Sequence, residues 1–369
     1  MPPCRVLHVI TSLDQGGSEG YLRQLAPLLL ARGIEQQVVS MVSGGVHAAG
    51  LRDAGIPVTE LGMRRGLPDP RGLWTLRKVI ADFRPNLIQG WLYHANLLAL
   101  AANSIPRFSF KAVPKPALLW GIRSAEMDQS RYGLGLRIAV GASARLSRFA
   151  DCIVANSEAG RADHVRLGFA PECFDVIPNS IDTERFVPDA HARESVRREL
   201  GIAPDAQLAG VFARNDPMKN LPQIVAGVGE VPDLEAIFAG VGTEKMAPTD
   251  RCHFLGVRSD VPRLMAACDF TVLASKSEGF PNVVAESLAC GVPVVTANVG
   301  DAAAILGEAG CVFECEDWQG FACCLKEMAS MTPERRSQLG VVGRRRVVSR
   351  YSADSSVGRF LEVYSRFAC

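Results

Sequence analysis

The sequence predicts an α/β protein of two domains, each built on a parallel sheet. Strand-like and helix-like patterns alternate from one end of the chain to the other, which is typical of parallel sheets covered by helices. The 369 residues are too many for one ordinary hydrophobic core. A proline- and charge-rich stretch near the middle marks the interdomain connection, RFVPDAHARESVRRELGIAPDA.

The first domain is expected over residues 1–185. Its predicted strands are RVLHVI, QQVVSMV, PVTEL, NLIQGW, ALLWGIR, DCIVANS and FDVIPNSID. Helix patterns lie between them, and the first, GYLRQLAPLLLARG, ends in Arg32 and Gly33, a good C-terminal signal. The uncharged stretch 85–106 carries several polar side chains, which indicates a strand and a buried helix rather than a membrane span.

The second domain is expected over residues 186–350. Its predicted strands are LAGVFAR, AIFAGVG, CHFLGV, FTVLAS, VPVVTA and GCVFEC. The last segment, 351–369, is amphipathic and predicts a closing helix.

Composition narrows the class of protein. A net charge of +1 is against a broad nucleic-acid surface. No secretory signal is visible, because RVLHVI is short and leads into a polar glycine loop. The eleven cysteines include no CxxC pair and no cluster at zinc spacing, so a reduced, cytoplasmic protein with buried thiols is expected. A disulfide between adjacent Cys323 and Cys324 is not expected.

Charged residues follow two predicted strands of the second domain. Arg214 and Lys219 come after LAGVF, and Glu278 and Glu286 bracket EGFPNVVAE after FTVLAS. Ligands of open parallel sheets bind at the carboxyl ends of strands. Two cations and a helix N-terminus can neutralise a diphosphate there, and a carboxylate can accept hydrogen bonds from sugar hydroxyls. The alternatives are two solvated surface cations and an acidic first turn that complements the helix dipole.

Five segments together resemble the GT4-type family of retaining glycosyltransferases with the GT-B fold. They are SLDQGGSEGYLRQLAPLL, NSEAGRADHVRLGF, VIPNSIDTERFVP, ARNDPMKNL and SEGFPNVVAESLACGVPVV, the last with the family's Glu-x7-Glu spacing. The resemblance implies two facing Rossmann-like domains with an interdomain cleft. It places the donor on the C-terminal domain, the acceptor on the N-terminal domain, and a final helix that crosses back to the first domain.

The resemblance also assigns roles to residues. It places Arg214 and Lys219 on the donor diphosphate, Glu278 at the donor sugar and Glu286 on the ribose hydroxyls. Backbone N–H groups of the turn at the helix start would also bind the donor, at Gly279, Phe280 and Asn282. Two departures alter the phosphate loop without removing a charge: Ala213 stands where a glycine is commoner, and Asn215 stands where an apolar residue is.

Candidate residues in the first domain carry more than one interpretation. Gly16 and Gly17 open a helix and suit a close approach to the donor, although the pattern is not GxGxxG and a plain glycine turn is the alternative. Glu19 is either an acceptor contact or an acidic first-turn residue. His94 is either the family's catalytic contact to the donor sugar or a structural histidine. Arg123 is either an anion contact or part of a structural ion pair.

These observations predict transfer of a sugar from a nucleotide diphosphate sugar to a lipid-linked or polysaccharide acceptor, and the resemblance implies retention of configuration. UDP-sugar is the favoured donor and GDP-mannose the second, and GVRSDVP is expected near the base. No DxD motif is present, and Arg214 with Lys219 can neutralise the diphosphate, so neither a metal nor another cofactor is expected. The alternatives are a sugar-nucleotide epimerase or a phosphorylase on the same fold, although no pyridoxal lysine site is visible, and a non-enzymatic sugar-nucleotide-binding partner in polysaccharide assembly.

One basic, apolar segment bears on localisation. Residues 131–150 carry Arg131, Arg137, Arg145 and Arg148 and no acidic residue. Such a segment suits weak contact with the inner face of an anionic membrane, and the favoured alternative is a helix whose arginines are solvated.

Overall fold

The chain folds into two α/β units. The computed structural model describes residues 4–64, 69–105, 115–123 and 133–367. The first unit comprises Met1–Pro178 with Ser356–Cys369, and the second comprises Asn179–Ser355. The division falls ahead of the boundary at residue 185 expected from the sequence. The reason is that Ile181, which lies before that boundary, is buried in the core of the second unit.

The first unit contains a sheet of seven parallel strands among its described residues, in the order β3-β2-β1-β4-β5-β6-β7. Each corresponds to a strand predicted from the sequence. The strands are β1 (Arg5–Ile10), β2 (Glu35–Ser40), β3 (Val58–Glu60), β4 (Leu87–Trp91), β5 (Ala117–Ile122), β6 (Cys152–Ala155) and β7 (Phe174–Val176). The central strands are buried on both faces, which explains their nearly continuous apolar sequences.

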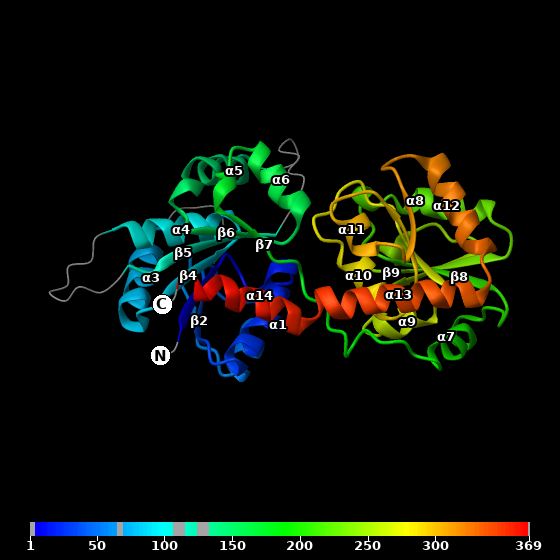
Figure 1. Cartoon of the computed structure of the whole chain (residues 1–369), viewed down its shortest axis with the longest axis horizontal. Helices are drawn as coiled ribbons and strands as arrows, with labels where there is room; N and C mark the ends of the chain where they lie inside the picture. Colours follow the sequence, from blue (N-terminus) through cyan, green and yellow to red (C-terminus); the bar gives the residue numbers. More distant parts are fainter. Residues whose placement is uncertain (1–3, 65–68, 106–114, 124–132, 368–369) are drawn as a thin grey trace. The chain divides into compact units, whose positions relative to one another are not determined.

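Helices cover both faces of this sheet (Figure 1). One face carries α1 (Gly17–Ala31), α2 (Ala48–Asp53) and α14 (Ala353–Ser365). The other face carries α3 (Pro70–Phe83), α4 (Tyr93–Ser104) and α5 (Leu134–Leu146). The short helix α6 (Glu158–Arg166) precedes β7. α1 ends beside Arg32 and Gly33 as predicted, because Gly33 has a left-handed φ of 84°.

The C-terminal helix α14 packs on the first unit, which confirms the predicted return of the chain. Val357, Phe360 and Tyr364 are buried in the same core as α1. The Tyr21 hydroxyl lies 2.6 Å from Ser356 Oγ. These contacts give the last segment of the chain its place in the first unit.

The second unit contains six parallel strands among its described residues, in the order β10-β9-β8-β11-β12-β13. They confirm the six predicted strands: β8 (Gln207–Phe212), β9 (Leu234–Ala239), β10 (Cys252–Gly256), β11 (Phe270–Leu273), β12 (Val294–Ala297) and β13 (Gly310–Phe313).

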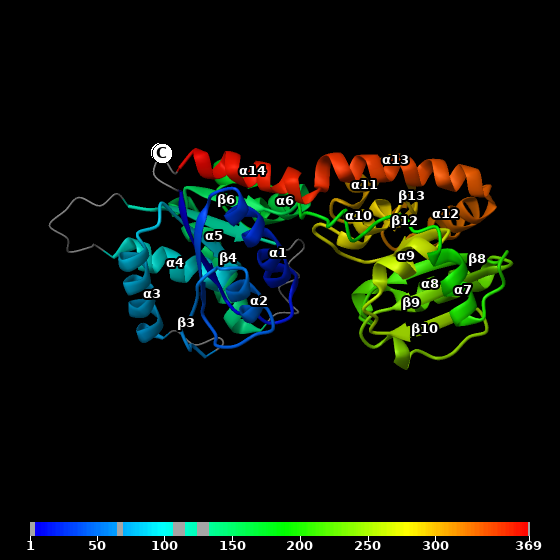
Figure 2. The same ribbon diagram turned by 90° about the horizontal axis from the view of Figure 1, so that it is seen from below.

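Helices also cover both faces of the second sheet. One face carries α8 (Leu221–Glu230) and α12 (Trp318–Ser330). The other carries α7 (Ala192–Leu200), α9 (Val261–Ala267), α10 (Asn282–Ala289) and α11 (Ala302–Leu306). The long helix α13 (Pro333–Tyr351) packs against α10 and α11 (Figure 2). The result is a second three-layer unit with its own core.

The cysteines differ in part from the expectation of buried thiols. A disulfide joins Cys311 of β13 to Cys324 of α12, whose Cα atoms are 5.7 Å apart. Packing of α12 against β13 brings these distant positions into bonding range. Cys323 remains an exposed free thiol. Within the described ranges, no helix combines the length and apolar character needed to cross a bilayer.

Candidate functional site

The loop after β8 holds the two predicted phosphate cations. Arg214 is exposed, and its Nε donates to Asp216 Oδ2 at 3.0 Å. Asp216 also caps the short 3₁₀ helix that ends at Lys219, because its Oδ1 accepts from the Met218 N–H at 2.9 Å. That backbone hydrogen bond, followed by the contact with Arg214, lowers the pKa of the Asp216 carboxyl. Asp216, which the sequence analysis did not single out, therefore orders the loop and orients Arg214.

The structure brings Lys219 and Glu278 together. The Lys219 ammonium forms an ion pair with the Glu278 carboxylate, and both side chains remain partly exposed. The loops after β8 and β11 are joined twice more. The buried Asn220 donates from Nδ2 to the Ala274 carbonyl at 2.8 Å, and the Lys276 N–H donates to the Met218 carbonyl at 2.9 Å. The basic loop and the acidic turn are thus one structural unit.

The loop after β12 contacts the backbone of the turn from Glu278 to Gly279 and fixes its position. The Asp301 N–H donates to the Gly279 carbonyl at 3.0 Å. Gly300 has a φ of 56°, and a Cβ there would stand 2.3 Å from the Glu278 carbonyl oxygen. A side chain would therefore displace the turn, so close backbone approach requires glycine at this position.

The start of α10 is fixed by packing and by a side-chain hydrogen bond. The Phe280 side chain is buried and packs edge-on against Tyr351, with the two ring centroids 5.4 Å apart. Its backbone N–H, and not its side chain, is therefore the group that could contact a ligand. α10 begins at Asn282, with Pro281 in the capping position. Asn282 is exposed, and its Oδ1 accepts from Asn179 Nδ2 at 2.8 Å.

Glu286 lies in the middle of α10 and is only partly exposed. Burial raises the pKa of its carboxyl to about 7, and the positive charge of Arg185 opposes this effect. A carboxyl whose pKa is raised to near neutral pH, as that of Glu286 is, and which lies next to a predicted ligand site is a candidate functional group.

Two valines add an apolar surface beside the charged loops. Val241 follows β9 and is 65% exposed, and Val257 follows β10 and is 73% exposed. A hydrogen bond from the Gly240 N–H to the Gly256 carbonyl, 2.8 Å long, holds these two strand ends together. Exposed apolar side chains at strand ends can contact the flat face of a ring.

Arg258, in the predicted base segment GVRSDVP, is already neutralised. It donates to both carboxylate oxygens of Asp260 at 2.8 Å and forms an ion pair with Glu199 at 2.9 Å. It therefore supports the loop rather than offering a free charge.

The charged loops lie at the switch point of the second sheet. β8 neighbours both β9 and β11, so the strand order reverses direction between β8 and β11. The helices that follow these two strands, α8 and α10, lie on opposite faces of the sheet. In open α/β sheets, ligands bind at the carboxyl ends of the strands beside such a point. Arg214, Lys219 and Glu278 follow these two strands.

The remaining candidates belong to the first unit, where β1 and β4 form the corresponding switch point. Gly16 and Gly17 open α1, and Ser12 Oγ donates to Glu19 Oε1 at 3.4 Å. A Cβ on Gly16 would stand 2.2 Å from Glu19 Oε2, so the Glu19 carboxylate folds back onto Gly16. His94 lies in the first turn of α4, where burial lowers its pKa.

Arg123, after β5, packs against aromatic rings. Its guanidinium carbon lies 3.7 Å from the centroid of the Tyr21 ring and 5.6 Å from that of Trp91. Burial lowers its pKa. The structure thus adds a cation–π contact to the two interpretations that the sequence allowed.

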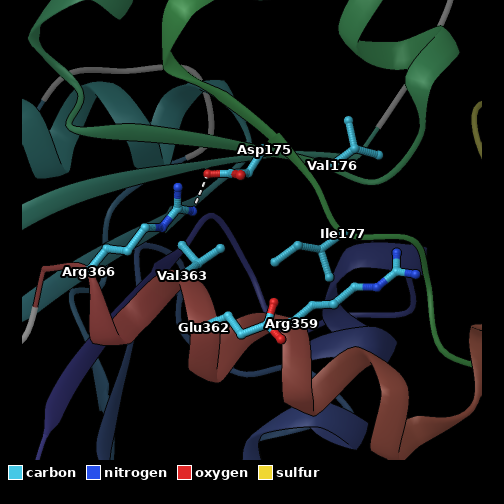
Figure 3. Close-up of a pocket in the computed structure, with 7 residues that line it drawn as sticks. All are labelled: Asp175, Val176, Ile177, Arg359, Glu362, Val363 and Arg366. Carbon is cyan, nitrogen blue, oxygen red and sulfur yellow. Dashed lines mark hydrogen bonds and ion pairs between the residues drawn. The ribbon is translucent and has the colours of Figure 1, made fainter.

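The described part of the chain contains no group of three or more His, Cys, Asp or Glu side chains arranged to hold a metal ion. A pocket in the first unit opens between β7 and α14 (Figure 3). It is lined by Asp175, Val176, Ile177, Arg359, Glu362, Val363 and Arg366. None of the predicted site residues lines it, and its Asp175 and Arg366 are paired with each other.

Two family models match the chain. The model described as Glycosyltransferase Family 4 matches residues 15–185, and the model described as Glycosyl transferases group 1 matches residues 209–330. Together they cover most of both units and include Arg214, Lys219, Glu278 and Glu286.

Curated relatives agree with these matches. The D-inositol 3-phosphate glycosyltransferase of Segniliparus rotundus is 30% identical over 224 residues, which cover 52% of this chain and 47% of the relative. The N,N'-diacetylbacillosaminyl-diphospho-undecaprenol alpha-1,3-N-acetylgalactosaminyltransferase of Campylobacter jejuni is 24% identical over 304 residues, 78% of this chain and 79% of the relative. The chain matches only about a third to a half of the length of the first of its curated relatives.

The fold matches solved structures over almost its whole length. Anabaena Alr3699/HepE in complex with UDP has a TM-score of 0.83 and 22% sequence identity, covering 98% of this chain and 100% of that one. WaaG, a glycosyltransferase involved in lipopolysaccharide biosynthesis, has a TM-score of 0.67 and 14% identity, covering 98% of this chain and 99% of that one.

Proposed function

Because the chain belongs to the GT4-type glycosyltransferases of the GT-B fold, we propose that it transfers a sugar from a nucleotide diphosphate sugar to a lipid-linked or polysaccharide acceptor. The reaction retains the anomeric configuration and needs no metal ion. The single observation that supports this most is the joined unit of Arg214, Lys219 and Glu278 at the switch point of the second sheet.

The diphosphate binds to the loop after β8. Lys219 has three N–H donors, so it can hold a phosphate oxygen while it keeps its contact with Glu278. Arg214 is exposed and can turn its planar guanidinium toward two phosphate oxygens. As the bond to the sugar breaks, negative charge grows on the leaving diphosphate. These cations stabilise that charge more in the transition state than in the ground state.

The acidic residues orient the sugars. Glu278 accepts hydrogen bonds from hydroxyls of the transferred sugar, and Lys219 holds its carboxylate in place. Glu286 accepts hydrogen bonds from the ribose hydroxyls. The nucleobase contacts the apolar surface of Val241 and Val257. No protein nucleophile is assigned, since retention in this proposal proceeds by attack from the face of the leaving group.

UDP-sugar is the favoured donor and GDP-mannose the second. The support for UDP is that Anabaena Alr3699/HepE, which shares the fold, has been solved with UDP and with UDP-glucose. The support for the acceptor is that the Campylobacter jejuni relative is named for a diphospho-undecaprenol substrate and a Rhizobium meliloti relative for lipopolysaccharide core biosynthesis.

A donor panel tests the proposal. The full chain is heated with UDP-, GDP- or ADP-sugars, and a ligand present at about 100 times its dissociation constant should stabilise it by about 2.7 kcal/mol. The stabilising donor is then tested for nucleotide release with lipid-linked and polysaccharide acceptors. If none of the sugar nucleotides stabilises the chain, the proposed donor site is rejected. Stabilisation without acceptor-dependent release, across the acceptor panel, would reject the transferase reaction.

A further inference from the structure

At the open edge of the first sheet, Val176 presents a backbone N–H and C=O that no described residue bonds. β7 is the last strand of that sheet, and Ala155 of β6 lies opposite Val176. The Ile177 N–H donates to the Ala155 carbonyl at 2.9 Å. In a parallel ladder this bond turns the N–H and C=O of Val176 away from β6. Both groups therefore face the open edge.

Two opposite charges lie beside this edge without a partner among the described residues. Arg359 and Glu362 line the pocket between β7 and α14, and they share one face of α14 because they are three residues apart (Figure 3). Neither forms an ion pair within the described ranges, whereas Asp175 and Arg366 in the same pocket pair with each other. The pocket has a volume of about 420 Å³, which leaves room for side chains of another molecule.

These groups are complementary to a second copy of the same surface. In an antiparallel pair, residues that lie opposite each other can exchange both hydrogen bonds, so Val176 of each copy can donate to and accept from Val176 of the other. A two-fold axis through that pair places the same surface on both copies. It lays the two α14 helices side by side in opposite directions, where Arg359 of each copy can meet Glu362 of the other. Two hydrogen bonds and two ion pairs then satisfy these four groups in each copy.

Other partners fit this edge less well. An added peptide strand gains its affinity from a row of main-chain hydrogen bonds. β7 has only three residues, and Pro178, which has no N–H, follows it closely, so the row of outward N–H groups ends at Val176. Solvation of a short, charged edge is the remaining alternative, and it predicts a monomer.

We propose that two copies of the chain associate around this two-fold axis, through Val176 of β7 and through Arg359 and Glu362 of α14. The contact belongs to the first unit and joins the two parallel sheets by one antiparallel pairing, an arrangement that mixed sheets commonly show. The proposal does not depend on sugar transfer, because association is measured without any substrate.

Sedimentation velocity of the full chain over a range of concentrations tests the association. The parent should form a dimer. Arg359→Glu and Glu362→Arg should each weaken the dimer at least about tenfold, because each change places two pairs of like charges in the contact. The two single variants should form a mixed dimer when they are combined, because both contacts then join opposite charges. For the same reason, the double variant Arg359→Glu with Glu362→Arg should dimerise as the parent does.

Arg137 of α5 supplies the matched control. It is exposed, forms no ion pair with a described residue, and belongs to a helix on the opposite face of the sheet from α14. Arg131, of the same predicted basic segment, lies outside the described residues. Arg137→Glu should leave the dimer unchanged, and all variants should keep the parent melting temperature because the replaced side chains lie at the surface.

Three results would overturn the proposal. The first is a parent chain that sediments as a monomer at every concentration. The second is equal weakening of the dimer by Arg137→Glu and Arg359→Glu, which would make the effect one of net charge. The third is a failure of the two single variants to associate when they are mixed, which would exclude the two-fold pairing of Arg359 with Glu362.

Discussion

Replacing Glu286 by glutamine is expected to stabilise the folded chain above neutral pH and, at the same time, to weaken donor binding. The carboxyl lies in the middle of α10, and burial raises its pKa to about 7. In the unfolded chain the same group has its ordinary pKa of 4.5. Glutamine keeps the shape of the side chain and carries no charge at any pH.

The sign follows from proton binding. Between pH 4.5 and 7 the folded state keeps a proton on Glu286 that the unfolded chain releases, so the free energy of unfolding falls as pH rises. The loss is complete above pH 7 and amounts to at most about 3 kcal/mol, at about 1.4 kcal/mol per pKa unit. Partial exposure of the side chain lowers this limit. Glu286→Gln should therefore match the parent near pH 4.5 and exceed its stability by up to about 3 kcal/mol at pH 8.

Urea unfolding of the parent and the variant at a series of pH values measures this difference. Other titrating groups are common to both proteins and cancel in the comparison. Glu308, an exposed carboxylate in the same unit, supplies the control, and Glu308→Gln should change stability by less than about 0.5 kcal/mol at every pH. The same samples, titrated with the donor found in the thermal panel, report the expected loss of affinity.

A stability difference that does not change with pH would refute the reasoning, because it would mean that burial does not perturb this carboxyl. A variant that is more stable at pH 8 but binds the donor as tightly as the parent would keep the electrostatic argument. It would remove Glu286 from the ribose site.

Three further outcomes are expected. Lys219→Ala should lower donor turnover about 100-fold, as loss of one oxyanion contact does, and should change the melting temperature little because its ion pair is partly exposed. The exposed Lys245→Ala is the control and should leave turnover unchanged, and an equally unchanged turnover in Lys219→Ala would exclude Lys219 from the site. Acidification from pH 6.5 to 4 should lower the His8 contribution to the free energy of unfolding by up to about 3 kcal/mol, because burial lowers the pKa of His8 to about 4 and the unfolded chain takes up the proton first. This loss opposes the gain from Glu286 over the same range, so it is measured as the difference between the urea-derived pH profiles of His8→Gln and the parent. Parallel profiles of the two proteins would contradict the assignment. In non-reducing buffer, Cys324→Ser should lose up to about 3 kcal/mol in the loop-entropy model, whereas Cys323→Ser should not; equal stability of the two variants would argue against the disulfide.

Apolar runs and turn residues in the sequence predicted the strands and the ends of helices well. The apolar run RVLHVI became β1 because a strand buried on both faces of a parallel sheet needs continuous apolar residues. Gly33 marked the end of α1 because it adopts a left-handed φ that favours glycine. Each of these signals acts within a few residues, so it can be read without knowing what the segment packs against.

The parts that sequence reasoning missed depend on contacts between distant segments. Asn220 and Gly300 looked like ordinary loop residues, yet one bonds the end of β11 and the other fits against the Glu278 turn. The disulfide between Cys311 and Cys324 requires α12 to pack on β13. The division between the units falls ahead of the expected boundary at residue 185 because Ile181 is buried in the core of the second unit.

The amino-acid sequence by itself determined the alternation of strands and helices, the two domains, the family, and which charged residues follow which strand, because periodicity and motif spacing are local properties. Only the tertiary structure decided that Lys219 forms an ion pair with Glu278 and that burial raises the pKa of the Glu286 carboxyl to about 7. It also decided that α5 exposes large apolar side chains. β8 and β11 are neighbours in the sheet although β9 and β10 lie between them in the sequence, so the loops that follow β8 and β11 meet only in the folded chain. The burial that shifts the pKa of a side chain depends in the same way on residues from distant parts of the sequence.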